Sequence, residues 1–174
     1  MVAPDRQPRP LLTPGRVRAL LDRHGLRPSR ALGQHYLADP NTARKVVRLA
    51  GVRQGETVVE VGPGLGSLTL ALREAGAEVV AVEADARLLP ALAEALGDDP
   101  LVRVVVADAL RVDLGALAPA AAALVANLPY NSAATLVLRV LAGTPRIGHQ
   151  TVRVQREVGE RLAARPGTAA YGGA

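Results

Sequence analysis

The chain has 174 residues, 49% hydrophobic and 21% charged, which fits one folded domain of ordinary size. It contains no Cys, which excludes disulfides and thiolate metal or redox sites, and its three scattered His (His24, His35 and His149) do not predict a metal centre. Every apolar run is shorter than the ~20 residues of a membrane span, and no signal-peptide pattern begins the chain, so we expect a cytoplasmic protein.

The net charge of +5 is unevenly distributed, and all but one of the 21 cationic residues are Arg. Residues 1–48 carry a net +7, residues 49–143 carry −5 and residues 144–174 carry +3. A near-acidic middle between basic ends is typical of a central small-molecule site with polyanion contacts at its margins, as in nucleic-acid-binding proteins. A merely biased composition, with Arg in place of Lys, would give the same pattern, so charge alone leaves both interpretations open.

The N-terminal 51 residues are expected to precede the main sheet. Residues 1–12 contain three Pro and no periodicity, and we interpret them as a disordered leader. Residues 13–51 are interpreted as an N-terminal helical arm interrupted by a loop. In chain order, the predicted elements of this arm are a helix capped by Thr13 and ending before Gly25, a loop over 25–38, and a helix capped by Asp39 and ending before Gly51.

Residues 52–174 alternate short apolar runs with helical stretches, a pattern typical of repeated βαβ units. The predicted strands are 57–61, 78–82, 102–107, 122–126 and 150–155. The predicted helices are 67–75, 86–96, 132–142 and 158–164, with an Ala-rich connector over 116–123. These elements predict an α/β, Rossmann-like fold with a doubly wound, mostly parallel sheet, and a ligand site beyond the carboxyl ends of its strands.

A glycine-rich turn, with Gly62, Gly64 and Gly66, joins the first predicted strand to a helix. Glycines let a backbone approach a ligand closely, although a purely structural turn would also use them. The third glycine comes one residue too early for a dinucleotide-binding motif, and Glu60 would repel a pyrophosphate, which disfavours a nicotinamide-dependent dehydrogenase. A carboxylate suits a cationic ligand, so we predict S-adenosylmethionine as the cofactor, with its ammonium and sulfonium charges.

Acidic residues also end the next two predicted strands. Glu83, about 20 residues after the glycine turn, can accept both hydroxyl hydrogens of a ribose. Asp85 is better explained as a helix N-cap. Asp108 could accept a hydrogen from an adenine amino group or could cap a turn, and the residue alone does not decide between the two. Together with Glu60, these acids predict an adenosyl pocket.

The segment Asn127-Leu128-Pro129-Tyr130 follows the fourth predicted strand. The Asn127 oxygen and the Leu128 carbonyl can accept the two hydrogens of an exocyclic amine, while Tyr130 stacks on its base. That arrangement aims the nitrogen lone pair at a methyl donor, and transfer then depends on positioning and desolvation. A structural turn would explain Pro129 but gives no reason for an aromatic residue in a chain with 2% aromatics.

Taken together, these motifs resemble those of the ribosomal RNA adenine dimethyltransferases, over about residues 13–174. The stretches that carry the resemblance are 32–37, 60–66, Glu83, Asp108, 127–131 and 155–158. The resemblance is greater to the branch that acts on small-subunit RNA, which usually has Leu at the position of Leu128, than to the antibiotic-resistance branch that acts on large-subunit RNA.

The resemblance implies a class I S-adenosylmethionine-dependent methyltransferase that N6,N6-dimethylates two adjacent adenosines near the 3′ end of small-subunit (16S) ribosomal RNA during ribosome biogenesis. It implies the ribosomal RNA or a pre-ribosomal particle as partner and no metal, and we expect a monomer. The target segment 127–130 would be catalytic. The residues it implies for cofactor binding are Gln34, His35, Leu37, Gly62, Glu83, Asp108 and Asn127, and the glycine turn itself adds Glu60 and Gly64.

The chain departs from the family pattern in three places. His35-Tyr36 replaces the usual Asn or His followed by Phe, and Thr151, Val152 and Val154 are smaller than the usual residues of the fifth strand. The family continues past the position of Ala174 into two more strands and a helical C-terminal domain, so we expect those parts to be missing here. A non-catalytic RNA-binding or assembly module of the same family is therefore the second hypothesis.

Overall fold

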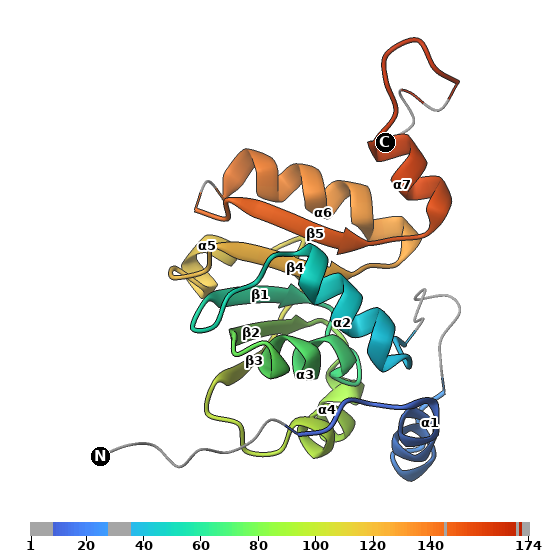
Figure 1. Cartoon of the computed structure of the whole chain (residues 1–174), viewed down its shortest axis with the longest axis vertical. Coiled ribbons are helices and arrows are strands. Elements are labelled where there is room, and N and C mark those ends of the chain that lie inside the picture. Colours follow the sequence, from blue (N-terminus) through green and yellow to red (C-terminus); the bar gives the residue numbers. More distant parts are fainter. Residues whose placement is uncertain (1–8, 28–35, 145, 170, 172–174) are drawn as a thin grey trace.

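A five-stranded parallel sheet forms the centre of the protein (Figure 1). The computed structural model describes residues 9–27, 36–144, 146–169 and 171, without the side chains of residues 130 and 131. The strands are β1 (Thr57–Val61), β2 (Glu78–Glu83), β3 (Val102–Val106), β4 (Ala123–Asn127) and β5 (His149–Arg153). The strand order is β3-β2-β1-β4-β5, so successive strands are added on one side of β1 up to β3 and on its other side from β4 onward. A doubly wound sheet opens a ligand crevice at such a switch, between β1 and β4.

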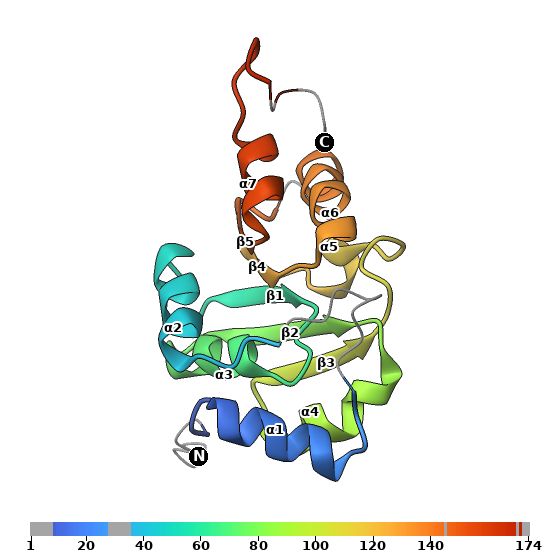
Figure 2. The ribbon, with the colours of Figure 1, turned by 90° about the vertical axis from the view of Figure 1, so that its right-hand side faces the viewer.

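Helices cover both faces of this sheet, as Figure 2 shows for α1, α3 and α4 against α6 and α7. The helices are α1 (Pro14–Arg23), α2 (Pro40–Leu49), α3 (Ser67–Glu74), the 3-10 turn η1 (Ala86–Leu88), α4 (Leu89–Leu96), α5 (Leu114–Leu117), α6 (Tyr130–Gly143) and α7 (Arg156–Leu162). Side chains alternate along each strand, so Val58 packs with the α1–α4 side and Val59 with the other. Both neighbours are fully buried, which explains the continuous apolar runs.

The fold class predicted from sequence is confirmed, and most element boundaries differ by one or two residues. The predicted helix over 86–96 divides into η1 and α4 at Leu89-Pro90, where Pro fits the first turn of a new helix. One element was not predicted: α5, which Asp113 caps, overlaps the start of the stretch interpreted as a connector. The predicted caps Thr13, Asp39 and Asp85 all accept hydrogen bonds from the first turns of their helices.

The interpretation of residues 1–12 as a disordered leader is wrong at its C-terminal end. Residues 1–8 lie outside the described residues, but Leu11 and Leu12 are buried, with Leu12 only 1% exposed. They belong to the same apolar cluster as α1 and α4. The local Pro content concealed these two anchors, because burial of a leucine depends on the surface it meets and not on its neighbours in sequence.

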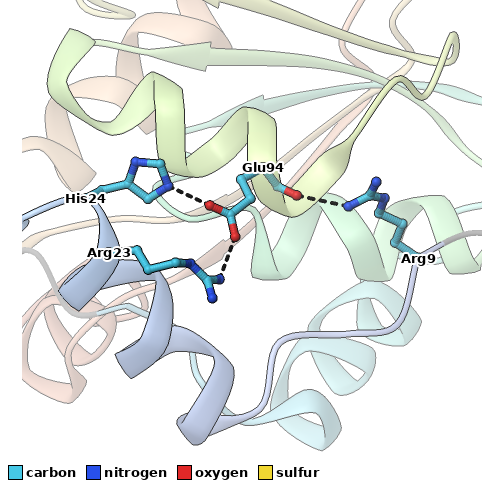
Figure 3. Close-up of polar contacts among 4 residues, drawn as sticks. All are labelled: Arg9, Arg23, His24 and Glu94. Carbon is cyan, nitrogen blue, oxygen red and sulfur yellow. Dashed lines mark hydrogen bonds and ion pairs between the residues drawn. The ribbon is translucent and has the colours of Figure 1, made fainter.

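The N-terminal arm is also held to α4 by polar contacts around Glu94 (Figure 3). The Glu94 carboxylate accepts from Arg23 at 2.5 Å and pairs with His24 Nε2 at 2.7 Å. Arg9 donates to the Glu94 backbone carbonyl over 2.9 Å. These contacts join the segment before α1 and the C-terminal end of α1 to one residue of α4, so the arm packs as part of the domain.

Candidate cofactor and target-base site

A cavity of about 510 Å³ opens at the carboxyl ends of the strands, where the topology predicts a ligand. It gathers residues from the segments that follow all five strands. The predicted site residues that line it are Leu37, Glu60, Gly62, Gly64, Glu83, Asp108, Asn127, Leu128 and Pro129. Gln34 and His35 lie outside the described residues, and so does the Tyr130 side chain.

The glycine turn between β1 and α3 forms one wall of the cavity. Gly64 has φ of +58°, a conformation that strains residues with a side chain. A Cβ at this position would also lie 3.3 Å from the Tyr36 ring, which lines the same cavity. Gly64 therefore allows both the sharp turn and the close approach of the aromatic ring.

Glu83 ends β2 with its carboxylate fixed by backbone donors. Its Oε2 accepts the N–H of Gly64 over 3.0 Å, and its Oε1 accepts the N–H of Asp85 over 2.9 Å. The side chain is 6% exposed, and burial raises its pKa while these backbone hydrogen bonds act in the opposite direction. Each oxygen has a further lone pair, so the carboxylate can accept two hydroxyl hydrogens without leaving this position.

Glu60 lines the same cavity and is 1% exposed. Among the described residues, neither carboxyl oxygen has a hydrogen bond of normal geometry, although the hydroxyl and backbone N–H of Thr69 lie near enough to favour the carboxylate. Burial raises its pKa to about 8, with the charge of Glu83 acting in the same direction and Thr69 opposing. A buried acid without a hydrogen bond of normal geometry is costly, and a cationic group entering the cavity would supply both a counter-charge and hydrogen-bond donors.

Asp108 fits both interpretations that its sequence position left open. Its Oδ1 accepts the N–H of Leu110 over 2.9 Å, which caps the turn after β3. The same side chain lines the cavity, is 46% exposed, and lies 3.4 Å from the Arg111 guanidinium. Asp108 can therefore stabilise its turn and still present an acceptor to a ligand.

Asn127 ends β4 on the opposite side of the cavity and contacts β5. Arg153 donates to Asn127 Oδ1 over 2.8 Å, and the backbone N–H of Leu128 donates to the Arg153 carbonyl over 2.9 Å. Arg153 also lines the cavity and was missed by the sequence analysis. The predicted strand over 150–155 placed Arg153 inside a strand, whereas β5 ends at Arg153, and its pairing with Asn127 depends on the strand register.

The sequence comparison decides the family. Residues 26–173 match the family model described as ribosomal RNA adenine dimethylase. The chain belongs to the ribosomal RNA adenine dimethylase family. Over 93% of the chain, it is 52% identical to a protein of Thermobifida fusca named ribosomal RNA small subunit methyltransferase A, and the match covers 58% of that relative.

Solved structures share this fold. A dimethyladenosine transferase from Plasmodium falciparum matches 79% of the chain and 49% of that structure, with a TM-score of 0.65 and 24% identity, and supports the fold. The 23S rRNA methyltransferase ErmE matches 73% of the chain and 50% of that structure, with a TM-score of 0.63 and 29% identity.

The chain spans a little over half the length of the curated relatives of the dimethylase family that it matches. In the part of the chain that the structure describes, no helix has both the length and the apolar character needed to cross a bilayer. The described His, Asp and Glu side chains likewise form no group of three suited to a metal ion.

Proposed function

We propose that this chain is the cofactor- and target-binding core of an S-adenosylmethionine-dependent ribosomal RNA adenine dimethyltransferase. The observation that carries the proposal is the 510 Å³ cavity in which the buried Glu60, with no hydrogen bond of normal geometry, lies together with Glu83 and Asn127. An apolar cavity with a few converging polar groups and a strongly shifted pKa is typical of a functional site. Family membership then selects the chemistry among the many that this fold supports.

The residues of the cavity fit the proposed cofactor group by group. Glu60 would pair with the ammonium, Glu83 would accept the ribose hydroxyls, and Asp108 would accept from the adenine amino group. The glycine turn and Leu37 would contact the remainder. From the family resemblance, we assign Gln34 and His35 to the same site.

The cofactor would supply an electrophilic methyl group on its sulfonium. The chain's own contribution is to hold the target amine: Asn127 Oδ1 and the Leu128 carbonyl accept its hydrogens, and Tyr130 stacks on the flipped base. Pro129, next to them, lacks an N–H and has a restricted φ, which keeps the segment before α6 in one conformation. Positioning of this kind needs no general base during the attack, because the neutral amine forms the new N–C bond with its own lone pair. The methylated nitrogen then releases one proton to solvent.

We assign the target as two adjacent adenosines near the 3′ end of small-subunit ribosomal RNA. The 52% identity to a relative named for the small subunit favours this target over the large subunit, for which ErmE is named. The partner is then the RNA or a pre-ribosomal particle in the cytoplasm, and we propose that the protein acts as a monomer.

The test is methyl transfer to hypomethylated small-subunit particles, followed by mapping of the modified bases. With a radiolabelled methyl donor, we expect labelled methyl groups at N6 of two adjacent adenosines, and no labelling by Asn127→Ala. Label at another position would refute the assigned target. Particle binding without any transfer, unchanged in a Glu83→Ala, Asn127→Ala double variant, would instead support the non-catalytic RNA-binding alternative.

A further inference from the structure

Arg153 contacts the target segment through both its side chain and its backbone. The register of the two parallel strands pairs Asn127 of β4 with Arg153 of β5. The guanidinium donates to Asn127 Oδ1 over 2.8 Å, and the Arg153 carbonyl accepts from Leu128 N–H over 2.9 Å. One residue therefore contacts both residues to which the proposed function assigns the target amine.

The donor-only character of arginine determines which end of the Asn127 amide faces it. An amide side chain has nearly the same shape after a half-turn, but the turn exchanges its acceptor oxygen for an NH₂ donor. A guanidinium has five N–H donors and no acceptor, so only the oxygen can face Arg153. A carbonyl oxygen accepts two hydrogen bonds, so the same atom can serve Arg153 and a target amine.

We propose that Arg153 is a positioning residue that holds the Asn127 amide in its acceptor orientation for the incoming adenine. This inference rests on the proposed function. Loss of Arg153 removes a hydrogen bond that only the acceptor orientation can make, so the turned orientation, in which the Asn127 NH₂ group faces the NH₂ group of the target, becomes more populated. Two donors facing one another cannot hydrogen-bond, so a fraction of bound targets would be held unproductively.

Loss of the Arg153 side chain should affect binding of the target amine and not binding of the cofactor. In the sheet, β4 separates β5 from β1 and β2, which carry Glu60 and Glu83. Replacing the Arg153 side chain also leaves the backbone hydrogen bond from Leu128 intact. Cofactor affinity and the folding of the β4–β5 pair should therefore change little.

The experiment compares Arg153→Met, Arg153→Lys and the control Arg156→Met. Arg156 carries the same charge close by in sequence, but it is 86% exposed and pairs with Glu160 inside α7. For each protein, kcat and KM are measured on hypomethylated small-subunit particles, and the dissociation constant of S-adenosylmethionine by equilibrium dialysis. The side-chain amide signals of Asn127 are followed by ¹⁵N NMR.

For Arg153→Met we expect kcat to fall about tenfold, with cofactor affinity unchanged within about twofold. A turned Asn127 amide misplaces the target amine but does not touch Glu60 or Glu83, which are proposed to bind the cofactor. Arg153→Lys, which retains a donor, should restore part of kcat, and the Asn127 amide signals should shift in Arg153→Met but not in Arg156→Met.

An unchanged kcat in Arg153→Met, or a change in KM alone, would overturn the positioning role, the latter by marking Arg153 as an RNA contact. A wild-type chain that binds no cofactor would instead overturn the proposed function, and with it this inference.

Discussion

The two halves of the cavity are built by different means. On the β1–β2 half, Glu60 and Glu83 are at most 6% exposed, and Glu83 is fixed by two backbone N–H groups. On the β4–β5 half, Asn127 is only partly buried and accepts from another side chain, that of Arg153. Backbone donors are part of the fold and survive substitution, whereas a side-chain donor is lost with one mutation. The cofactor half should therefore be the more robust, and the target half the more adjustable.

The largest expected effect comes from Glu83→Ala. This change leaves the N–H groups of Gly64 and Asp85 without their acceptor and removes both proposed ribose contacts. We expect affinity for S-adenosylmethionine to fall by at least about a hundredfold, since two charge-assisted hydrogen bonds are worth some 3 kcal/mol or more. Equilibrium dialysis measures it. Glu78→Gln, at the opposite end of β2, is the control and should bind normally. Full affinity in Glu83→Ala would remove Glu83 from the site.

Asn127→Ala should separate the two halves most clearly. It removes the proposed acceptor for the target amine and leaves the acids of the cofactor half in place. We expect methyl transfer to fall about a hundredfold or more, as for loss of one group that orients the reacting atoms, with cofactor affinity unchanged. Single-turnover transfer and equilibrium dialysis on the same preparation measure both. A parallel loss of cofactor affinity would show that the halves are not independent.

Glu60 should make cofactor binding depend on pH. Its pKa of about 8 means that the free protein holds this carboxyl protonated at neutral pH, whereas a bound ammonium would favour the carboxylate. Binding therefore releases a proton, and affinity should rise from pH 6 toward pH 8, by up to about tenfold per pH unit. Glu60→Gln, of nearly equal shape, should bind more weakly and show a flatter profile. A wild-type profile as flat as that of the variant would exclude Glu60 as the counter-charge.

The raised pKa of Glu60 also makes the free energy of unfolding depend on pH. The folded-state pKa of Glu60 lies above its ordinary value of 4.5, so folding favours the protonated form. The stabilising contribution is complete below about pH 4.5 and is lost as pH rises through about 8. Urea unfolding of the ligand-free protein should show stability falling across that window, relative to Glu60→Gln. A constant difference between the two proteins would contradict the burial of an ionisable group here.

The smallest effect should come from Glu94→Gln, which weakens the contacts between the N-terminal arm and α4. The side chain is 40% exposed, and ion pairs at such positions contribute little. Hydrogen bonds and charges from His24 and Arg23 lower the Glu94 pKa, so its contribution is present at neutral pH and lost as pH falls through that lowered value. Melting temperatures measured from pH 7 into the acid range test this, and the difference between variant and wild type should shrink as pH falls through the lowered pKa. An equal difference across that range would assign the effect to packing.

Much of the site could be predicted because its residues follow strand ends, where a parallel sheet collects them. Glu83 and Asn127 were found in this way, and both line the cavity. The role of Arg153 could not be predicted, because its contact with Asn127, 26 residues earlier in the chain, depends on the register between β4 and β5. The protonated state of Glu60 depends on burial, and the buried Leu12 on a surface formed by distant helices, so neither is encoded locally.

The most direct test of the central claim is equilibrium dialysis of radiolabelled S-adenosylmethionine against the folded chain at pH 8, close to the pKa of Glu60. The account predicts a single saturable site that is retained in Asn127→Ala and lost in Glu83→Ala. A folded wild-type sample that binds no cofactor, or that binds it equally well without Glu83, would contradict it.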